Sequence, residues 1–205
     1  MSFAQELDSL RTPPKKDVKP VPEAGTPAPK HPNLELPTDK ATIIVFLRHC
    51  GCPFAEKTFK ALTRLSTQHP EIHFLAVSHS SSESTERWVV SVGGNWDVQV
   101  LIDEERDLYA LFGLPTSSTW HVLSPIALYN TLQLGKQEGV WNRPTESGNR
   151  WQTAGAFAID KDNIVRWKWV ANRADDLADL DKAVLALGST PRPKPPPPAA
   201  SHGFL

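Results

Sequence analysis

The chain has 205 residues, of which 22 are basic and 23 acidic, so its formal net charge at pH 7 is −1. This balance argues against a nucleic-acid-binding surface as its main function. No apolar stretch approaches the roughly 18 residues that a transmembrane helix needs, and Glu6 and Asp8 stand where a secretory signal would be apolar. We therefore expect a cytoplasmic protein that binds neither nucleic acid nor membrane.

Proline divides the chain into three parts. Eight of its 19 prolines fall in residues 1–39 and six follow Gly188, which leaves five for the stretch between. We predict disordered, solvated Pro-rich arms at both ends, over 1–39 and 189–205, and one domain over 40–188. Within the N-terminal arm, 2–11 has the spacing of a short docked helix. The run Pro195 to Pro198 favours polyproline II, which SH3-like or WW-like domains bind, but a solvated tail without a partner is the simpler interpretation.

Between the arms, the hydrophobic pattern alternates between strand and helix periods. In chain order it predicts a strand at 43–47, a helix with its apolar face over 54–65, a strand at 72–77, a helix that opens at the capping box of Ser80 and Glu83 and ends at Gly93, a strand at 98–102 and a helix at 104–112. A helix at 124–134, a hairpin of strands at 154–159 and 164–170, and a helix at 176–187 follow. This order predicts an α/β protein with a mixed central sheet, helices on both faces and an insertion, as in a thioredoxin-like fold.

The candidate chemistry lies in Arg48-His49-Cys50-Gly51-Cys52-Pro53, between the first strand and the first helix. Reactive groups of open α/β sheets gather at this edge. Pro53 suits the first helical position, so Cys52 is the predicted N-cap, at a solvent-facing helix start. Free backbone N–H groups and the helix dipole would favour the thiolate form of Cys52, and Arg48 would add a positive charge.

Each of the neighbouring groups has a plainer interpretation beside the functional one. Cys50 packs in the core or reacts, with equal support for both, whereas the position of Cys52 favours a reactive thiol over a packing role. His49 is a proton shuttle, a metal ligand or simply a hydrogen-bonded side chain. His79 would emerge at the same sheet edge and is a candidate substrate-binding residue. Because no second CxxC and no HxxxH supplies the usual spacing, we expect no metal site, and nothing indicates a cofactor.

From Lys40 to Gly188 the chain resembles the peroxiredoxin-like branch of the AhpC/TSA group, within the thioredoxin superfamily. Three stretches carry the resemblance: Phe46-Leu47-Arg48-x-x-x-Cys52-Pro53-Phe54, Asp103-x-x-Arg106-x-Leu108-Tyr109-x-x-Phe112-Gly113-Leu114, and Gly155-x-Phe157-x-Ile159-Asp160 with Ile164 and Ala174-Asp175-Asp176 after it. The resemblance implies that Cys52 is the attacking cysteine of a thiol-dependent, antioxidant oxidoreductase. It would react with a peroxide or a disulfide and give a sulfenic acid or a mixed disulfide.

The chain departs from the family pattern at three places. Ala55 replaces the second cysteine of the CPxC turn. Val45 and His49 stand where a typical peroxiredoxin has Pro and Thr, and the strand that begins near Ala154 lacks the preceding cis-proline of thioredoxins. Cys50 or an external thiol such as glutathione would then have to resolve Cys52, and a disulfide between Cys50 and Cys52 would be strained. The sequence does not choose between these two partners.

A polar loop at 135–152 supports a second hypothesis. It carries two of the seven tryptophans, Trp141 and Trp151, together with Arg143 and Arg150. Aromatic and basic side chains over the Cys52 edge would suit an organic ligand, whereas the plainer interpretation is that the rings hold the loop to the domain. The alternative function is therefore a repurposed thioredoxin-fold protein that binds or transforms a small organic molecule, as in specialised metabolism, without redox cycling. The sequence does not indicate the substrate, the electron donor or the oligomeric state.

Overall fold

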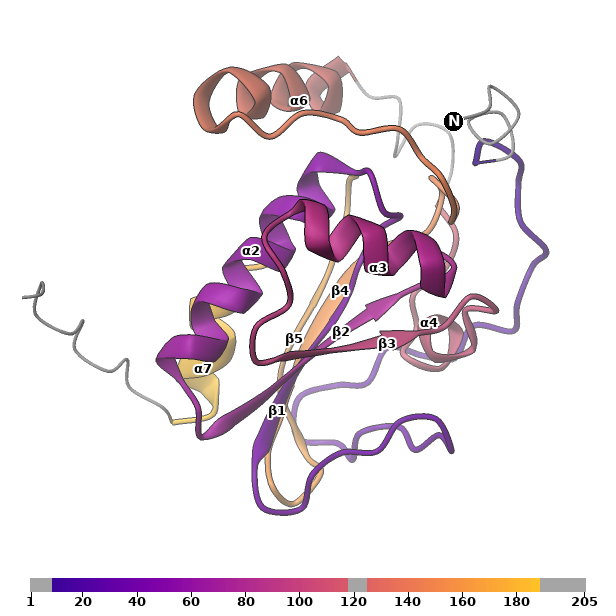
Figure 1. Ribbon diagram of the computed structural model, residues 1–205. Helices are drawn as coiled ribbons and strands as arrows, with labels where there is room; N and C mark the ends of the chain where they lie inside the picture. Colours follow the sequence, from indigo (N-terminus) through magenta and orange to yellow (C-terminus); the bar gives the residue numbers. More distant parts are fainter. Residues whose placement is uncertain (1–8, 118–124, 189–205) are drawn as a thin grey trace, which may run out of the picture.

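The computed structural model describes residues 9–117 and 125–188 (Figure 1). Predictions on the C-terminal tail and on residues 1–8 lie outside the described residues. The end of the proposed short helix, residues 9–11, forms a turn and a bend.

A five-stranded mixed sheet forms the centre of the molecule, with the strand order β3-β2-β1-β4-β5. Its strands are β1 (Ala41–Phe46), β2 (Ile72–Ser78), β3 (Val98–Ile102), β4 (Gly155–Ile159) and β5 (Val165–Val170). The first three strands are parallel, and β4 and β5 form the predicted antiparallel hairpin beside β1. This is the mixed α/β arrangement of a thioredoxin-like fold.

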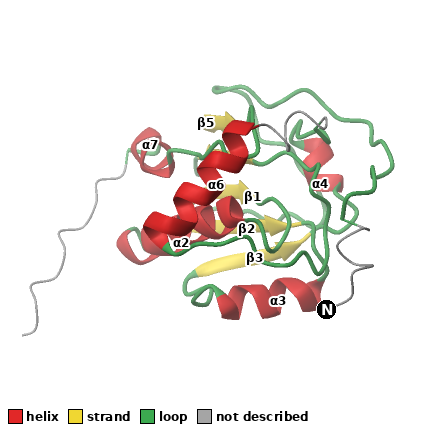
Figure 2. Cartoon of the chain, turned by 90° about the horizontal axis from the view of Figure 1, so that it is seen from above, coloured by secondary structure: helices red, strands yellow, loops and turns green. Residues whose placement is uncertain are grey.

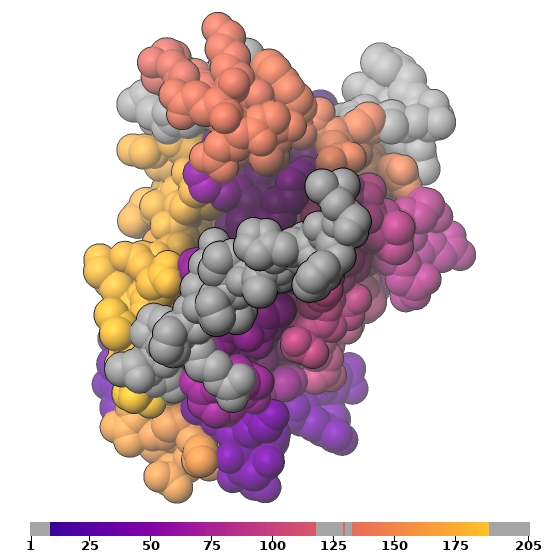
Figure 3. All heavy atoms as spheres, turned by 60° about the vertical axis from the view of Figure 1, so that its left-hand side comes forward, coloured from indigo at the N-terminus to yellow at the C-terminus, as the bar shows by residue number. Residues whose placement is uncertain are grey.

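Helices cover both faces of the sheet. They are α2 (Pro53–Gln68), α3 (Ser82–Ser91), α4 (Asp107–Leu111), α6 (Pro125–Glu138) and α7 (Leu180–Ala186). Helices α2, α3 and α7 pack on one face and α4 on the other, and α3 and α4 lie on opposite sides of the sheet in Figure 2. Helix α6 belongs to the insertion before β4, and its residues form the top of the molecule in the space-filling view (Figure 3). Among the described residues, none of these helices has both the length and the apolar character that a membrane span requires.

Strand β1 is buried on both faces, which explains its continuous apolar run. Ile43 and Val45 face the cluster under α2, and Ile44 and Phe46 face the cluster under α4. A central parallel strand therefore leads directly into the turn that carries the two cysteines.

The N-terminal segment differs from the expectation of a solvated arm. Residues 9–39 contain no helix and no strand longer than an isolated bridge, as their prolines predict, but they pack on the domain. Ala28 and Leu34 are buried in the same cluster as α4, and Lys19 and Gly25 donate backbone hydrogen bonds to the domain. The prolines hold the segment extended along the sheet, so it covers apolar surface that α4, a helix of five residues, leaves open.

Three helices begin at other residues than predicted, because the side chains that accept their first backbone N–H groups lie at other positions in the sequence. Ser81, and not Ser80, is the N-cap of α3 and accepts from the N–H of Ser84. The Asp103 carboxylate accepts N–H groups at the start of α4, which therefore begins at residue 107 and not at 104. Asp179 caps α7, four residues further along than predicted.

Candidate functional site

The turn from β1 to α2 places Cys52 at the helix N-cap, as predicted. Cys52 has extended backbone angles, Pro53 is the first helical residue, and no side chain caps the helix. The N–H of Cys52 donates to the carbonyl of His49 at 3.1 Å, which closes the turn. The sulfur of Cys52 thus sits at a helix start whose backbone N–H groups have no side-chain acceptor.

Arg48 faces the sulfur of Cys52. Its Nη1 donates to Cys52 Sγ at 3.4 Å and to the carbonyl of Ala174 at 3.3 Å, and its Nη2 donates to the carbonyl of Arg150 at 2.7 Å. Arg48 is only 6% exposed and forms no ion pair with a carboxylate among the described residues. The sulfur of Cys52 is the side-chain acceptor that this buried guanidinium has among the described residues, since its other acceptors are backbone carbonyls.

Cys52 is buried, which corrects the expectation of a solvent-facing thiol. Only 3% of the residue is exposed, because Pro53, Phe54 and the loop after α6 enclose the turn. A cavity of about 10 Å³ lies beside the turn, lined among others by Arg48, Phe54 and Ala55. This volume is about that of one water-sized probe, so only a very small molecule fits without movement of the protein.

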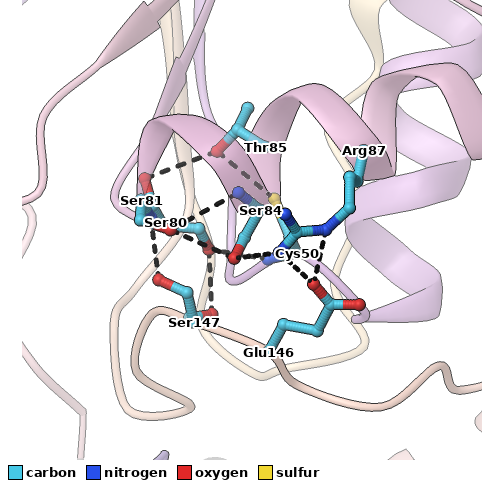
Figure 4. A network of polar contacts seen from close by, with 8 residues as sticks. All are labelled: Cys50, Ser80, Ser81, Ser84, Thr85, Arg87, Glu146 and Ser147. Carbon is cyan, nitrogen blue, oxygen red and sulfur yellow. Dashed lines mark hydrogen bonds and ion pairs between the residues drawn. The ribbon is translucent and has the colours of Figure 1, made fainter. Parts of the chain in front are cut away.

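Cys50 has different neighbours (Figure 4). Its N–H donates to Ser80 Oγ at 3.1 Å, and its sulfur lies 3.7 Å from Thr85 Oγ1. Ser78 Oγ, which the figure does not include, lies 3.8 Å from the same sulfur. Burial raises the pKa of the Cys50 thiol, an effect larger than the opposing hydrogen bonds from the three hydroxyls. Cys50 also lines a pocket of about 280 Å³ with Trp88 of α3 and residues of the 143–146 loop. The sulfurs of Cys50 and Cys52 share no hydrogen-bond partner in the described structure.

Residues 143–149 of the inserted loop form a cover over this turn. The N–H of Arg143 donates to the carbonyl of Gly51 at 2.9 Å. Ser147 accepts from Ser80 Oγ and from the N–H of Ser81, at 3.0 and 2.7 Å, and Glu146 pairs with Arg87 of α3 (Figure 4). Residues 143–149 thus lie over the turn of the two cysteines and are joined to it and to the start of α3.

The two histidines lie under this cover and are uncharged at neutral pH. Burial lowers the pKa of His49 well below its ordinary value, and nearby Arg48 and Arg150 lower it further. Neither ring nitrogen of His49 has a partner in the described structure. Burial also lowers the pKa of His79 to about 4, and its Nε2 lies 3.0 Å from the backbone nitrogen and 3.1 Å from the carbonyl oxygen of Asn149. In the described part of the chain, no group of three His, Cys, Asp or Glu side chains is placed to hold a metal ion.

The four loop side chains proposed to bind an organic ligand lie in or beside the cover, and all four contact other parts of the protein. Arg143 pairs with Glu56 of α2. Arg150 donates to Ser9 Oγ at 2.9 Å, and Trp151 Nε1 donates to the carbonyl of Leu10 at 2.9 Å. Trp141 is half exposed and lies against Gly135 of α6. These contacts match the plainer interpretation, in which the loop is tied to α2, α6 and the N-terminal segment.

Sequence reasoning missed the polar residues around Cys50. Ser78, Ser80 and Thr85 are buried and hydrogen-bonded to one another, through a 2.9 Å contact between Ser78 Oγ and Thr85 Oγ1 and a 3.2 Å bond from the N–H of Ser80 to Ser78 Oγ. Their position in the sequence could have indicated them. Ser78 ends a parallel strand next to β1, Ser80 follows it in the loop, and Thr85 lies in the first turn of α3.

Comparisons with known proteins support this description. A family model described as AhpC/TSA antioxidant enzyme matches residues 61–173, which is more than half of the chain and begins nine residues after Cys52. No curated protein matches the sequence.

Solved structures share the fold at low identity. A peroxiredoxin-like protein from Aquifex aeolicus is 15% identical, with a TM-score of 0.56 over 83% of this chain and 89% of that chain. A putative thiol:disulfide interchange protein DsbE from Chlorobium tepidum is 15% identical, with a TM-score of 0.52 over 82% of this chain and 99% of that chain. The peroxidoxin BcpB from Mycobacterium tuberculosis is 15% identical, with a TM-score of 0.51 over 73% and 79%.

Proposed function

We propose that this chain, which belongs to the AhpC/TSA antioxidant enzyme family, is a thiol-dependent peroxidase with Cys52 as its attacking cysteine. The observation that carries the proposal is the buried guanidinium of Arg48, 3.4 Å from Cys52 Sγ and without a carboxylate partner among the described residues. Arg48 and the N-terminus of α2 both favour a negative charge on the sulfur, and the thiolate is the form that attacks.

The proposed reaction converts the Cys52 thiolate to a sulfenic acid. The sulfur attacks one oxygen of hydrogen peroxide, so an S–O bond forms as the O–O bond breaks. The electron pair leaves with the second oxygen as hydroxide, which takes a proton from solvent and becomes water. Arg48 interacts with the sulfur throughout, whereas neutral His49 supplies no charge to it.

The burial of Cys52 favours hydrogen peroxide over bulky hydroperoxides as substrate. The small cavity beside Arg48 is bounded by Phe54, Ala55 and Trp169. A larger organic hydroperoxide would need the turn or the cover to move before its oxygen reached the sulfur.

We propose that an external thiol, and not Cys50, resolves the sulfenic acid. Cys50 Sγ is held by Ser78 and Thr85, away from the partners of Cys52. The turn between them has little freedom, because a Cβ at Gly51 would lie 2.8 Å from the carbonyl oxygen of Pro144. One thiol would displace water from the sulfenic acid and give a mixed disulfide, and a second thiol would release Cys52 as the reduced thiol.

Consumption of hydrogen peroxide with dithiothreitol as reductant tests both parts of the proposal. Cys52→Ser should abolish turnover, and Cys50→Ser should retain it, because only Cys52 forms the sulfenic acid and the reductant resolves it. Turnover that survives in Cys52→Ser would refute the peroxidase assignment. Loss of turnover in Cys50→Ser, with an internal disulfide in the wild type, would refute the external resolving thiol.

A further inference from the structure

Arg106 is the second buried arginine of the described structure. It is 8% exposed, and its side chain donates one hydrogen bond, from Nη2 to the carbonyl of Pro14 at 3.4 Å. No carboxylate among the described residues pairs with it. Arg48 shares this lack of a carboxylate, but it has the sulfur of Cys52. Near Arg106, the carboxylate of the adjacent Asp107 forms its ion pair with Lys16 instead. The Arg106 guanidinium therefore keeps N–H donors that a ligand can use.

The backbone at Arg106 is also unusual. Its φ of 62° and ψ of 32° are left-handed, which is uncommon for a residue other than glycine, asparagine or aspartate. Such strain persists only where the surroundings hold it. Here the Asp103 carbonyl accepts the N–H of Arg106, and the side chain enters a pocket between α4 and the N-terminal segment.

Both basic and apolar side chains line that pocket. Its volume is about 210 Å³. The basic groups are Arg106, Lys15 and Lys16, and Lys16 pairs with Asp107. Apolar walls come from Val18, Ala110, Leu114 and Pro115, and Gln152 completes the lining with Thr116.

We propose that this pocket binds a small organic carboxylate. The planar guanidinium of Arg106 presents paired N–H donors that match the two oxygens of a carboxylate. Contact with Val18, Leu114 and Pro115 would bury the short hydrocarbon chain of such a carboxylate. An inorganic anion has no hydrocarbon chain and would gain nothing from this contact. One water molecule occupies about 30 Å³ in the liquid, so the pocket has about seven times that volume. This size suits an anion with a few carbon atoms.

The site is separate from the proposed peroxidase chemistry. None of its lining residues contributes a hydrogen bond to Cys50 or Cys52. Cys52→Ser should therefore abolish peroxide turnover and leave carboxylate binding unchanged, so the two proposals fail independently.

Isothermal titration calorimetry on the full chain tests the site, with hexanoate as the probe. We expect saturable one-to-one binding of hexanoate and weaker binding of both 1-hexanol and inorganic phosphate. Arg106→Gln should weaken hexanoate binding at least tenfold and Lys15→Gln about threefold. Lys19→Gln is the matched control, because Lys19 pairs with Asp17 outside the pocket and its loss should change nothing.

A second measurement needs no variant at Arg106. Hexanoate should protect Lys15 of the wild-type protein from acetylation, read by mass spectrometry, and should leave Lys19 unprotected. Absence of saturable hexanoate binding, equal binding in Arg106→Gln, or equal labelling of Lys15 with and without hexanoate would overturn the proposal. Tighter binding of phosphate or 1-hexanol than of hexanoate would overturn the organic carboxylate as the ligand class.

Discussion

At the scale of single residues, the site depends on how two cysteines separated by one glycine are surrounded. Cys52 lies at a helix start beside a buried guanidinium, and Cys50 lies among hydroxyls that cannot neutralise a thiolate. Burial of Cys50 raises its pKa, so it stays protonated at neutral pH. The same short turn thus places one thiol beside a guanidinium and the other among hydroxyls, which is why the proposed function assigns the attack to Cys52.

The role of Arg48 predicts a charge-dependent loss of reactivity. Arg48→Gln should slow iodoacetamide alkylation of Cys52 at pH 6 by about tenfold or more, because the charge-assisted contact with the thiolate is lost. Arg48→Lys should retain part of the rate. Site-resolved mass spectrometry gives both rates.

Arg64→Gln is the control for this experiment, since Arg64 lies on α2, the helix that follows Cys52, but is exposed and pairs with Asp181. Equal alkylation rates in Arg48→Gln and the wild type would show that Arg48 does not support the thiolate.

The lowered pKa of His79 leads to a prediction of how the stability of the folded protein depends on pH. Its pKa is about 4 in the folded protein against 6.5 as its ordinary value, so the unfolded chain binds the proton more readily. The contribution of neutral His79 to the free energy of unfolding is complete above pH 6.5 and is lost as the pH falls towards 4. At about 1.4 kcal/mol per pH unit, it amounts to about 3 kcal/mol.

Urea unfolding between pH 7 and pH 4 measures this contribution. The free energy of unfolding of His79→Gln should fall less steeply over this window than that of the wild type, whatever the constant cost of losing the contact with Asn149. Parallel curves for the two proteins would mean that His79 does not carry the acid sensitivity.

At the scale of elements, the inserted loop holds the turn closed. Its backbone approaches Gly51 so closely that a Cβ there would meet the carbonyl oxygens of Arg143 and Pro144, at 2.9 and 2.8 Å. Gly51 also has a φ of 109°, which favours glycine. A side chain at this position therefore meets both strain and a steric clash.

Gly51→Ala should displace the 143–149 cover and raise the alkylation rate of Cys50 severalfold. Gly93→Ala is a closely matched control, because Gly93 has a φ of 115° but no atom within 4 Å of an added Cβ. Both variants carry backbone strain of about 1–3 kcal/mol, and only Gly51→Ala carries the clash. Equal Cys50 reactivity in both variants would show that the cover does not protect the turn.

The elements themselves were largely predictable, and their tertiary contacts were not. Local patterns give the five strands and place Cys52 at the N-cap of α2, because apolar periodicity and Pro53 act over a few residues. The burial of Cys52 depends on a loop almost a hundred residues away, which local patterns do not encode. Similarly, the start of α4 depends on the carboxylate of Asp103 and not on helical propensity.

At the scale of the whole molecule, the N-terminal segment belongs to the core. Its composition indicates a solvated arm, because prolines and lysines outnumber apolar groups. The few apolar groups it has are sufficient, since they face a sheet surface that only the short helix α4 also covers. A domain that begins at residue 40 would leave this surface exposed to water.

Leu34→Ala tests the contribution of this segment to stability. Leu34 is 8% exposed, so the substitution should lower the free energy of unfolding by about 2–4 kcal/mol. Leu185→Ala in α7 is the matched control, because Leu185 is 62% exposed and should change stability by less than about 0.5 kcal/mol. Similar unfolding curves for both variants would show that residues 9–39 do not contribute to the core.

The most direct test of the account is the site of oxidation when the fully reduced protein receives one equivalent of hydrogen peroxide. Dimedone traps sulfenic acids, and mass spectrometry locates the adduct. We predict an adduct on Cys52 in the wild type and in Cys50→Ser, and a much weaker one in Arg48→Gln. An adduct on Cys50, or no adduct on Cys52 in either protein, would contradict the assignment of Cys52 as the peroxide-reactive thiol.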